Sequence, residues 1–333
     1  MDRPANEAGI GGWLRTAWQK LQPHGAGDDS VRQETDHVVQ IADPVIRQAK
    51  RYRQVLRDPV AGAMEYFHSL IELIPGPIVL DRSHYYDDPA VKALFASFDE
   101  LEYVLQFSPE VDSLRKQGQR GPVVAMMTMQ QNERTIFGHK QDGEMLLRDV
   151  RQQAVSFSDH RIVAPAADME TTKTGIVNRG LEVLATVAME RITSLRAKKA
   201  ELEGKKEYLK GMMKILGGKS RRMEIFAVPA GKNRDELRKV ELLLAEVDRE
   251  LEELRNRIAL PEQSLGYLEK IMRQPEDMLF ARRQTLRLNW MGVRVGDEPG
   301  NEGNDIALAE FSMEEARRAA VLVTFSLTTV ASG

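Results

Sequence analysis

The sequence contains no cysteine. Disulfides, thiolate metal sites and a cysteine nucleophile are therefore excluded, and the composition suits a reducing compartment. No window approaches the roughly 18 consecutive apolar residues of a membrane span, and the N-terminus lacks the apolar core of a signal peptide. We therefore predict a cytoplasmic protein.

An excess of charge of one sign is also missing. The 47 lysines and arginines nearly balance the 50 aspartates and glutamates, which gives a net charge of -3. A surface built as a whole for nucleic acid would be strongly basic. The hydrophobic fraction of 42% is enough for a packed core, and 333 residues suggest about two domains of roughly 150 residues each.

The motifs of well-known catalytic sites do not occur. The chain has no GxSxG nucleophile elbow, no HExxH metal pair and no GxGxxG after a strand. Gly217-Gly218-Lys219-Ser220 resembles the end of a phosphate-binding loop, but that motif needs a glycine where Met213 stands. We interpret the two glycines as the end of a helix. No cofactor is predicted, and an enzyme is the less favoured interpretation.

One enzymatic alternative comes from two groups of possible metal ligands. Asp81 and His84 stand in one loop, and Asp159 and His160 stand at the end of a predicted strand. Two imidazoles with a carboxylate form a common metal site. Neighbouring residues on a strand point to opposite faces, however, and the spacing does not bring the two groups together. Turn and cap roles explain these residues more simply, so a metal-dependent enzyme is an alternative only.

The strongest pattern lies between Leu181 and Leu260. Apolar residues in its second half are spaced alternately three and four residues apart, as in the a/d seam of a coiled coil. They are Leu237, Val240, Leu244, Val247, Leu251, Leu254 and Ile258. The first half carries apolar residues at an interval of seven, namely Leu181, Ala188, Leu195, Leu202, Leu209 and Leu216. Asn233 and Glu236 form a variant of the capping box, which predicts the start of the second helix.

Two such helices in succession predict an antiparallel coiled-coil hairpin at residues 176–260. At about 1.5 Å per residue, the helix from Leu181 to Leu216 would be about 54 Å long, and the helix from Asp235 to Leu260 about 39 Å. Three arrangements are open. The hairpin could project as an arm, it could pack on its own domain, or the seam could join two chains.

The remaining sequence predicts an α+β fold. Residues 36–118 are expected to form a helical unit, because four residue pairs place a capping side chain before a proline. They are Asp43-Pro44, Asp58-Pro59, Asp88-Pro89 and Ser108-Pro109. Residues 119–175 and 261–333 are expected to form one domain with an antiparallel sheet. The hairpin would then be inserted between two halves of the sheet domain.

Short runs of period two predict the strands of this sheet. The runs before the hairpin are 123–129, 134–137, 144–147 and 154–157, with a turn at Asp142-Gly143. After the hairpin, residues 263–272 and 276–282 look helical, and strands are expected at 285–295, 306–311 and 319–327. Ser312 is expected to cap a short helix between the last two strands.

Residues 1–35 are interpreted as an amphipathic helix followed by a flexible linker from Pro23 to Ser30. Trp13, Leu14 and Trp18 lie on its apolar face. Such a helix could make a peripheral contact with a membrane through residues 10–21, or dock in a partner's groove. Folding back onto the body of the protein is the simpler alternative.

The connection between the hairpin helices is basic. Residues 205–222 contain seven lysines and arginines against one acid, whereas residues 297–315 contain acids and no lysine or arginine. This asymmetry can favour self-association, an acidic partner or contact with phosphates. The residues predicted to make contact at the hairpin tip are Lys219, Arg221, Arg222, Ile225 and Phe226.

We therefore predict a non-enzymatic interaction or assembly subunit. Its partner would be another protein or a second copy of the chain, so that it works as a complex subunit or a homo-oligomer. Nucleic-acid binding through the same basic tip is the alternative. Aromatic residues are sparse near the tip, which disfavours stacking on single-stranded bases.

Overall fold

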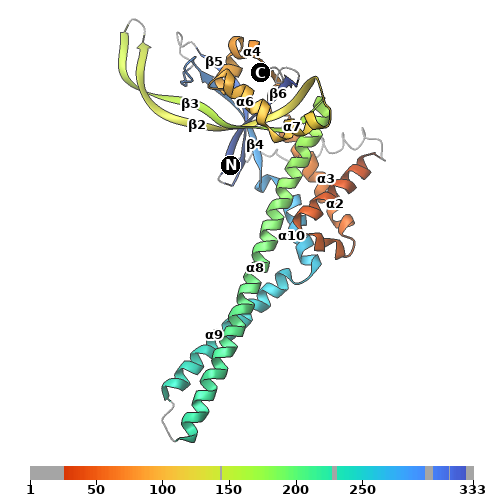
Figure 1. The fold of residues 1–333 in the computed structure, drawn as a ribbon, viewed down its shortest axis with the longest axis vertical. Helices are drawn as coiled ribbons and strands as arrows, with labels where there is room; N and C mark the ends of the chain where they lie inside the picture. Colours follow the sequence, from red (N-terminus) through yellow and green to blue (C-terminus); the bar gives the residue numbers. More distant parts are fainter. Residues whose placement is uncertain (1–25, 143–144, 227–230, 297–302, 315, 328–333) are drawn as a thin grey trace, which may run out of the picture. The chain divides into compact units, whose positions relative to one another are not determined.

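The computed structural model describes residues 26–142, 145–226, 231–296, 303–314 and 316–327. The chain divides into two compact units, which we call the hairpin unit (residues 1–61 and 182–273) and the sheet unit (residues 62–181 and 274–333). Two helices, α3 (Tyr52–Ile71) and α8 (Met169–Ile225), continue from one unit into the other (Figure 1). The helices expected as one unit at residues 36–118 are distributed between the two.

The hairpin unit contains an antiparallel pair formed by α8 and α9 (Gly231–Ile258). The predicted seam is buried in one apolar cluster. Its buried members are Ile192, Leu195, Leu202, Leu209, Leu216, Val240, Val247, Leu251, Leu254 and Ile258. Lys206 of α8 pairs with Asp248 of α9 at 2.6 Å, in agreement with the antiparallel alignment. The two apolar stripes pack against each other within one chain, so the seam is not exposed for joining two chains.

The first hairpin helix does not end at Gly217 and Gly218, as the sequence suggested. Instead, α8 continues through both glycines to Ile225. The seam also continues, because Asn233 of α9 is only 9% exposed and its side-chain amide donates to the carbonyl oxygen of Leu216 at 2.9 Å. This packing outweighs the cost of a glycine inside a helix, roughly 0.5–1 kcal/mol each. Asn233 is therefore a polar residue of the seam and not a helix cap.

Three shorter helices complete the hairpin unit. They are α2 (Ala26–Ala42), η1 (Pro44–Gln48) and α10 (Pro261–Arg273). The linker prediction is wrong from Ala26 onward, because α2 begins there. Acidic residues such as Asp29 suit the first turn of a helix, where the backbone dipole favours negative charge.

Three of the four predicted helix starts are confirmed, those at Asp43, Asp88 and Ser108, but only the side chains of Asp43 and Asp88 form a capping hydrogen bond. The start at Asp58-Pro59 is wrong, because α3 begins at Tyr52 and Pro59 lies inside it. A single apolar face runs across the proline. Its buried members are Leu56, Val60 and Ala63, at spacings of four and three. Burial of this face outweighs the loss of one backbone hydrogen bond at Pro59.

The sheet unit contains one open sheet in the order β3-β2-β6-β5-β4. The strands are β2 (Pro122–Asp142), β3 (Met145–Ala166), β4 (Phe280–Leu288), β5 (Asn304–Met313) and β6 (Ala316–Ser326). Neighbours on this path are antiparallel, and the short β1 (Ile78–Val79) pairs in parallel with β6. β2 precedes the hairpin in the sequence and β6 follows it, so their pairing joins strands from before and after the hairpin into one sheet. The predicted α+β class with an inserted hairpin is confirmed.

Some strand boundaries differ from the prediction. The four short strands expected before the hairpin are two long ones, β2 and β3, which pair over nearly their whole length with local irregularities. The polar run from Gln130 to Glu133 does not interrupt β2, because strands tolerate polar side chains wherever these reach solvent or polar partners. β2 and β3 flank the turn predicted at Asp142-Gly143, and residues 143 and 144 lie outside the described residues.

Two short helices expected after the hairpin are also wrong. At residues 276–282 the chain forms η2 (Pro275–Asp277) and then enters β4 at Phe280. Ser312 caps no helix, because β5 runs through it to Met313 and β6 begins at Ala316. Pairing with neighbouring strands satisfies the backbone here, and this long-range contribution is invisible to local propensity.

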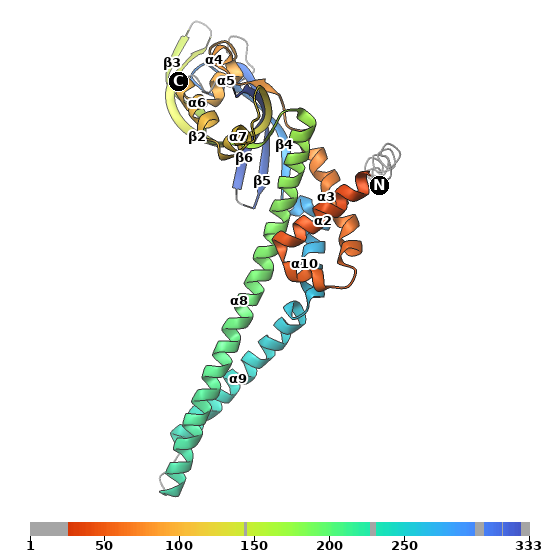
Figure 2. The same ribbon diagram turned by 45° about the vertical axis from the view of Figure 1, so that its right-hand side comes forward.

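Four helices pack on one face of the sheet: α4 (Arg82–Asp87), α5 (Pro89–Leu94), α6 (Phe98–Phe107) and α7 (Pro109–Lys116). Their apolar side chains, such as Leu94 and Leu101, share one core with alternate residues of the strands, such as Met127 and Val321. Figure 2 shows the strongly curved β2 and β3 beside these helices. The period-two pattern thus places one apolar face of the sheet under the helices.

The curvature brings the segment after β4 back to β3. Val293 forms an isolated bridge with Ala154, and the amide of Val155 donates to the carbonyl oxygen of Gly292 at 2.8 Å. The amide of Arg294 donates to the carbonyl oxygen of Gln153 at the same distance. The two ends of the strand order are therefore joined by a few backbone hydrogen bonds. Among the described residues, no helix combines the length and apolarity needed to cross a membrane.

Candidate functional site

The last turns of α8 carry the contact residues predicted from the sequence. Lys219, Arg221, Arg222 and Ile225 lie within the helix, and Phe226 follows it directly. The sequence had placed them in a loop, so the structure corrects their setting. Ile225 and Phe226 are 78% and 77% exposed, which is unusual for side chains of this size.

The phase of α8 explains why these side chains face outward. Leu209, Met213 and Leu216 pack in the seam at spacings of four and three, and Ser220, four residues on, accepts a hydrogen bond from Asn233 of α9. A helix turns by about 100° per residue, so positions such as Lys214 and Ile225 lie on the side away from Leu216, and both side chains are exposed. We define the tip surface by these outward residues: Lys214, Ile215, Lys219, Arg221, Arg222, Ile225 and Phe226. The periodicity that buries the leucines therefore exposes a mixed basic and apolar surface.

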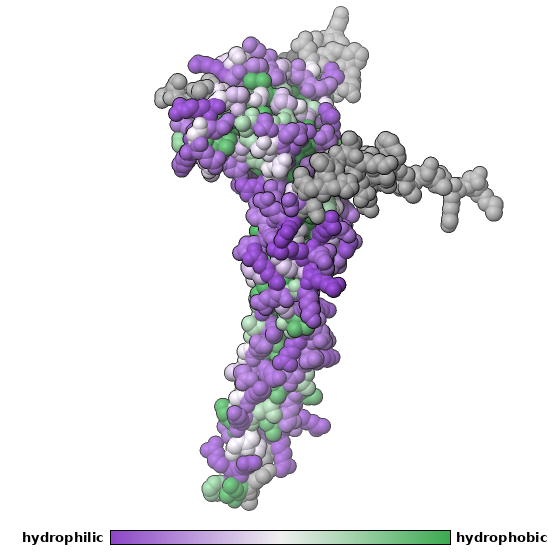
Figure 3. All heavy atoms as spheres, turned by 90° about the vertical axis from the view of Figure 1, so that its right-hand side faces the viewer, coloured by the Kyte–Doolittle hydropathy of each residue, from purple (hydrophilic) through white to green (hydrophobic). Residues whose placement is uncertain are grey.

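The tip surface has four cations, Lys214, Lys219, Arg221 and Arg222. None of them forms an ion pair with a described residue, whereas Lys210 nearby donates to Glu207 at 2.7 Å. That hydrogen bond lowers the pKa of Glu207, and the charges of Lys206 and Lys214 lower it further. Ile215 adds a third apolar side chain, 61% exposed. Figure 3 shows hydrophobic atoms at the surface of the hairpin's lower end, among hydrophilic ones.

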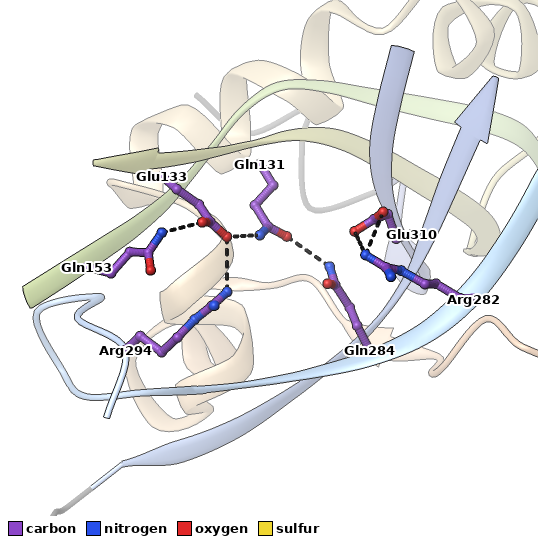
Figure 4. Close-up of polar contacts among 7 residues, drawn as sticks. All are labelled: Gln131, Glu133, Gln153, Arg282, Gln284, Arg294 and Glu310. Atoms are coloured by element: carbon purple, nitrogen blue, oxygen red, sulfur yellow. Dashed lines mark hydrogen bonds and ion pairs between the residues drawn. The ribbon is translucent and has the colours of Figure 1, made fainter. Parts of the chain in front are cut away.

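A second polar cluster, which the sequence did not predict, lies on the sheet. We call it the polar network, and its members are Gln131, Glu133, Gln153, Arg282, Gln284, Arg294 and Glu310 (Figure 4). Along β2, buried Met127 and Met129 point to the helix-covered face, and Gln131 and Glu133 continue the same alternation. The face that is apolar under the helices therefore becomes polar at one end.

Glu133 is the centre of the polar network. Its carboxylate accepts hydrogen bonds from Gln131 at 2.8 Å, from Arg294 at 3.0 Å and from Gln153 (Figure 4). Gln284 of β4 donates to the side-chain oxygen of Gln131 at 2.8 Å. This last bond joins β4 to β2, which are separated by β5 and β6 in the sheet order. Only a strongly curved sheet brings the two strands together.

The remaining pair of the polar network is Arg282 and Glu310, which face each other across β4 and β5. Arg282 donates to both carboxylate oxygens, at 3.1 and 3.2 Å. Glu310 is 13% exposed at its side chain, and its charge is neutralised there by Arg282. The polar network thus pairs its two arginines with its two glutamates, which suits a structural clasp better than a reactive site. The sequence does carry a sign of the polar network, because alternate positions of β2 change from Met127 and Met129 to Gln131 and Glu133.

Asp81 and His84 have a structural role at the start of α4. Asp81 caps this helix by accepting from the His84 amide at 2.8 Å, and it also contacts the His84 ring and the Ser83 hydroxyl. Partial burial opposes ionisation of Asp81, but these hydrogen bonds outweigh it and lower its pKa to about 2. The pair is therefore explained by helix capping.

Asp159 and His160 have different partners at an irregularity of β3, where Asp159 has a positive φ of 51°. His160 stacks on Phe95, with ring centroids 4.6 Å apart, and its Nε2 lies 2.8 Å from the carbonyl oxygen of Leu94. Asp159 instead accepts from Arg318 at 2.7 Å, a hydrogen bond that lowers the pKa of Asp159. Burial lowers the pKa of His160.

The metal alternative is not supported by these positions. Within the described part of the chain, no three His, Asp or Glu side chains gather in a way that could hold a metal ion. Asp81 and His84 are engaged at a helix start, and His160 is packed under α5, so the predicted ligand set does not assemble.

The predicted docking residues Trp13, Leu14 and Trp18 lie outside the described residues. Comparison with known proteins adds no functional assignment: no family model matches this chain, and neither a curated protein nor a solved structure is detectably similar to it.

Proposed function

We propose that this protein is a non-enzymatic interaction or assembly subunit, and that the tip surface of the hairpin is its contact site for a protein partner. The observation that carries the proposal is the exposure of Ile225 and Phe226, both above three quarters, beside four cations without a described ion-pair partner. Large exposed apolar side chains grouped together are typical of interaction sites.

The chemistry of the tip surface favours a protein over a nucleic acid. Ile215, Ile225 and Phe226 are exposed. Their burial against apolar groups of a partner would stabilise the complex by roughly 25 cal/mol per Å² of apolar surface. A phosphate backbone would use the cations and leave these side chains in water. A protein with acidic residues around an apolar depression would satisfy both parts of the surface.

The experiment is affinity capture with matched variants of the full chain. Arg221→Glu with Arg222→Glu reverses charge at the tip, and Ile225→Ser with Phe226→Ser removes the apolar groups. Arg191→Glu with Lys198→Glu is the control, because it reverses two exposed charges of the same helix away from the tip. We expect both tip variants to lose a protein that the wild type and the control retain.

Two results would count against this function. If the wild type and the three variants capture the same proteins equally well, the tip surface is not the contact site. Binding to nucleic acid that falls steeply with salt and is unaffected by Ile225→Ser with Phe226→Ser would favour the nucleic-acid alternative. The cytoplasmic location stays a prediction, which fractionation of cells that express the protein would test.

A further inference from the structure

The sheet unit has an exposed surface whose chemistry is opposite to that of the tip surface. Helix α6 buries Leu101 and Leu105 in the core, while its other side faces solvent. There Tyr103 and Phe107 are 63% and 60% exposed, and their ring centroids are 4.7 Å apart. We call the outward side of this helix the α6 face, and its members are Asp99, Glu102, Tyr103, Gln106 and Phe107.

The α6 face is acidic as well as aromatic. Asp99 and Glu102 are exposed, and neither forms an ion pair with a described cation. The face therefore has two exposed carboxylates next to a pair of exposed rings. The tip surface has Lys219, Arg221 and Arg222, which form no ion pair with a described residue, next to Ile225 and Phe226. The two surfaces carry charges of opposite sign, and each has exposed apolar side chains that a contact would bury.

Arginine is well suited to join two such surfaces. Its planar guanidinium can pair with a carboxylate and can also stack on an aromatic ring. On the tip surface Arg221 precedes Ile225, and Arg222 precedes Phe226, by four residues, which is about one helical turn. On the α6 face Glu102 directly precedes Tyr103. A contact between the surfaces would bury Ile225 and Phe226 against Tyr103 and Phe107, with the charged groups paired at its edge.

The acidic C-terminal segment considered from the sequence is a weaker acceptor for the tip. Residues 297–302 lie outside the described residues, and Glu310 is already paired with Arg282 and 13% exposed at its side chain. The α6 face combines charge with exposed rings, which that segment does not offer in its described part.

We infer that a second copy of this chain is the partner: the tip surface of one molecule docks on the α6 face of another. This inference rests on the proposed function of the tip surface and names its partner. The contact joins two different patches, so after one such contact the first molecule keeps a free α6 face and the second keeps a free tip surface. These two patches are complementary, so they either close a reciprocal dimer or bind further molecules in a ring or an open chain.

The test is a charge swap measured by light scattering and sedimentation on the full chain. The tip variant is Arg221→Glu with Arg222→Glu. The face variant is Glu102→Lys with Gln106→Lys, which leaves Asp99 unchanged because a carboxylate in the first helical turn stabilises the helix. Circular dichroism confirms that each variant is folded. Tyr103→Ser with Phe107→Ser is a second face variant that keeps all charges.

We expect the wild type to show an average mass that rises with concentration, and each variant alone to stay monomeric. An equimolar mixture of the tip variant and the face variant should associate again, because the reversed tip fits the reversed face. The mixture should then form assemblies as large as those of the wild type, because the unmodified α6 face of the tip variant also fits the unmodified tip surface of the face variant.

A wild type that stays monomeric up to about 1 mM, the weak end of measurable association, would overturn the inference. Association of the wild type that the face variants do not weaken would also overturn it. Neither result touches the proposed function, which fails only when the tip variants keep every captured protein. The two ideas are therefore separable by experiment.

Discussion

Arg196 of α8 reaches across to Asp43, whose carboxylate also caps η1 by accepting from the Val45 amide at 3.1 Å. The Asp43 side chain is 4% exposed, whereas that of Arg196 is 44% exposed. Arg196 also lies 3.5 Å from the Ser264 hydroxyl of α10. One buried carboxylate therefore holds three segments of the hairpin unit together.

We expect Asp43→Ala to lower the free energy of unfolding of the hairpin unit by about 2.5–4 kcal/mol. The change removes a helix cap, worth about 1 kcal/mol, and a hydrogen bond between charged groups, worth about 1.5–3 kcal/mol. Asp43→Asn should cost less, because an amide oxygen can still cap η1. Urea unfolding followed by circular dichroism measures both. Equal stability of the wild type and Asp43→Ala would contradict the role of this clasp.

Glycines 217 and 218 should limit the stability of the hairpin. Both lie inside α8, and a Cβ added at either would meet nothing within 4 Å. Alanine loses less backbone entropy than glycine in a helix, so Gly217→Ala and Gly218→Ala should each stabilise by about 0.4–1 kcal/mol. Thermal unfolding of the single and double variants checks this. Destabilisation by either alanine would show that the helix is interrupted here in solution.

Glu133 should support the curvature of the sheet. Glu133→Ala removes the acceptor of Gln131, Gln153 and Arg294, so we expect a loss of about 1–2 kcal/mol for a half-exposed group. Hydrogen exchange should become faster at the amides of Val155 and Arg294, which join β3 to the segment after β4. Arg134→Ala is the control. Its exposed side chain lies on the other face, and it should change stability by less than about 0.5 kcal/mol.

His160 should make the sheet unit less stable in mild acid. Burial lowers its pKa in the folded state, opposed by the Leu94 carbonyl and the nearby Glu100 carboxylate. Below its ordinary pKa of about 6.5, the unfolded chain binds a proton that the folded chain does not, so stability falls as pH decreases through this value. This loss of stability with decreasing pH ends once the pH is below the pKa of His160 in the folded state.

The comparison uses His160→Gln, which removes the titrating group. Between about pH 7 and pH 5 its stability should depend less on pH than that of the wild type. His68, whose pKa is also lowered by burial, contributes equally to both proteins. Nuclear magnetic resonance of the imidazole gives the direct check, since a His160 pKa at or above about 6.5 would refute the argument.

Much of the hairpin follows from the sequence alone. The seam from Leu195 to Leu216 and its partner from Val240 to Ile258 recur at heptad spacing, and this period is a local property of the chain. The same period decides that Ile225 and Phe226 face outward. The ends of the helices were less predictable, because Gly217 and Gly218 are tolerated only through contacts made by Asn233 of the other helix.

In the sheet, the sequence alone does not determine which strands and side chains come together. Alternation along β2 predicts that Met127, Met129, Gln131 and Glu133 share a face, but it does not say which strand lies opposite them. The bond between Gln131 and Gln284 depends on curvature accumulated across four strands, and the isolated bridge at Val293 depends on it as well. Periodicity fixed the faces of the helices and strands, because it acts between residues close in the chain. Only the tertiary structure decided which faces meet, because that depends on strand order, register and twist summed over distant segments.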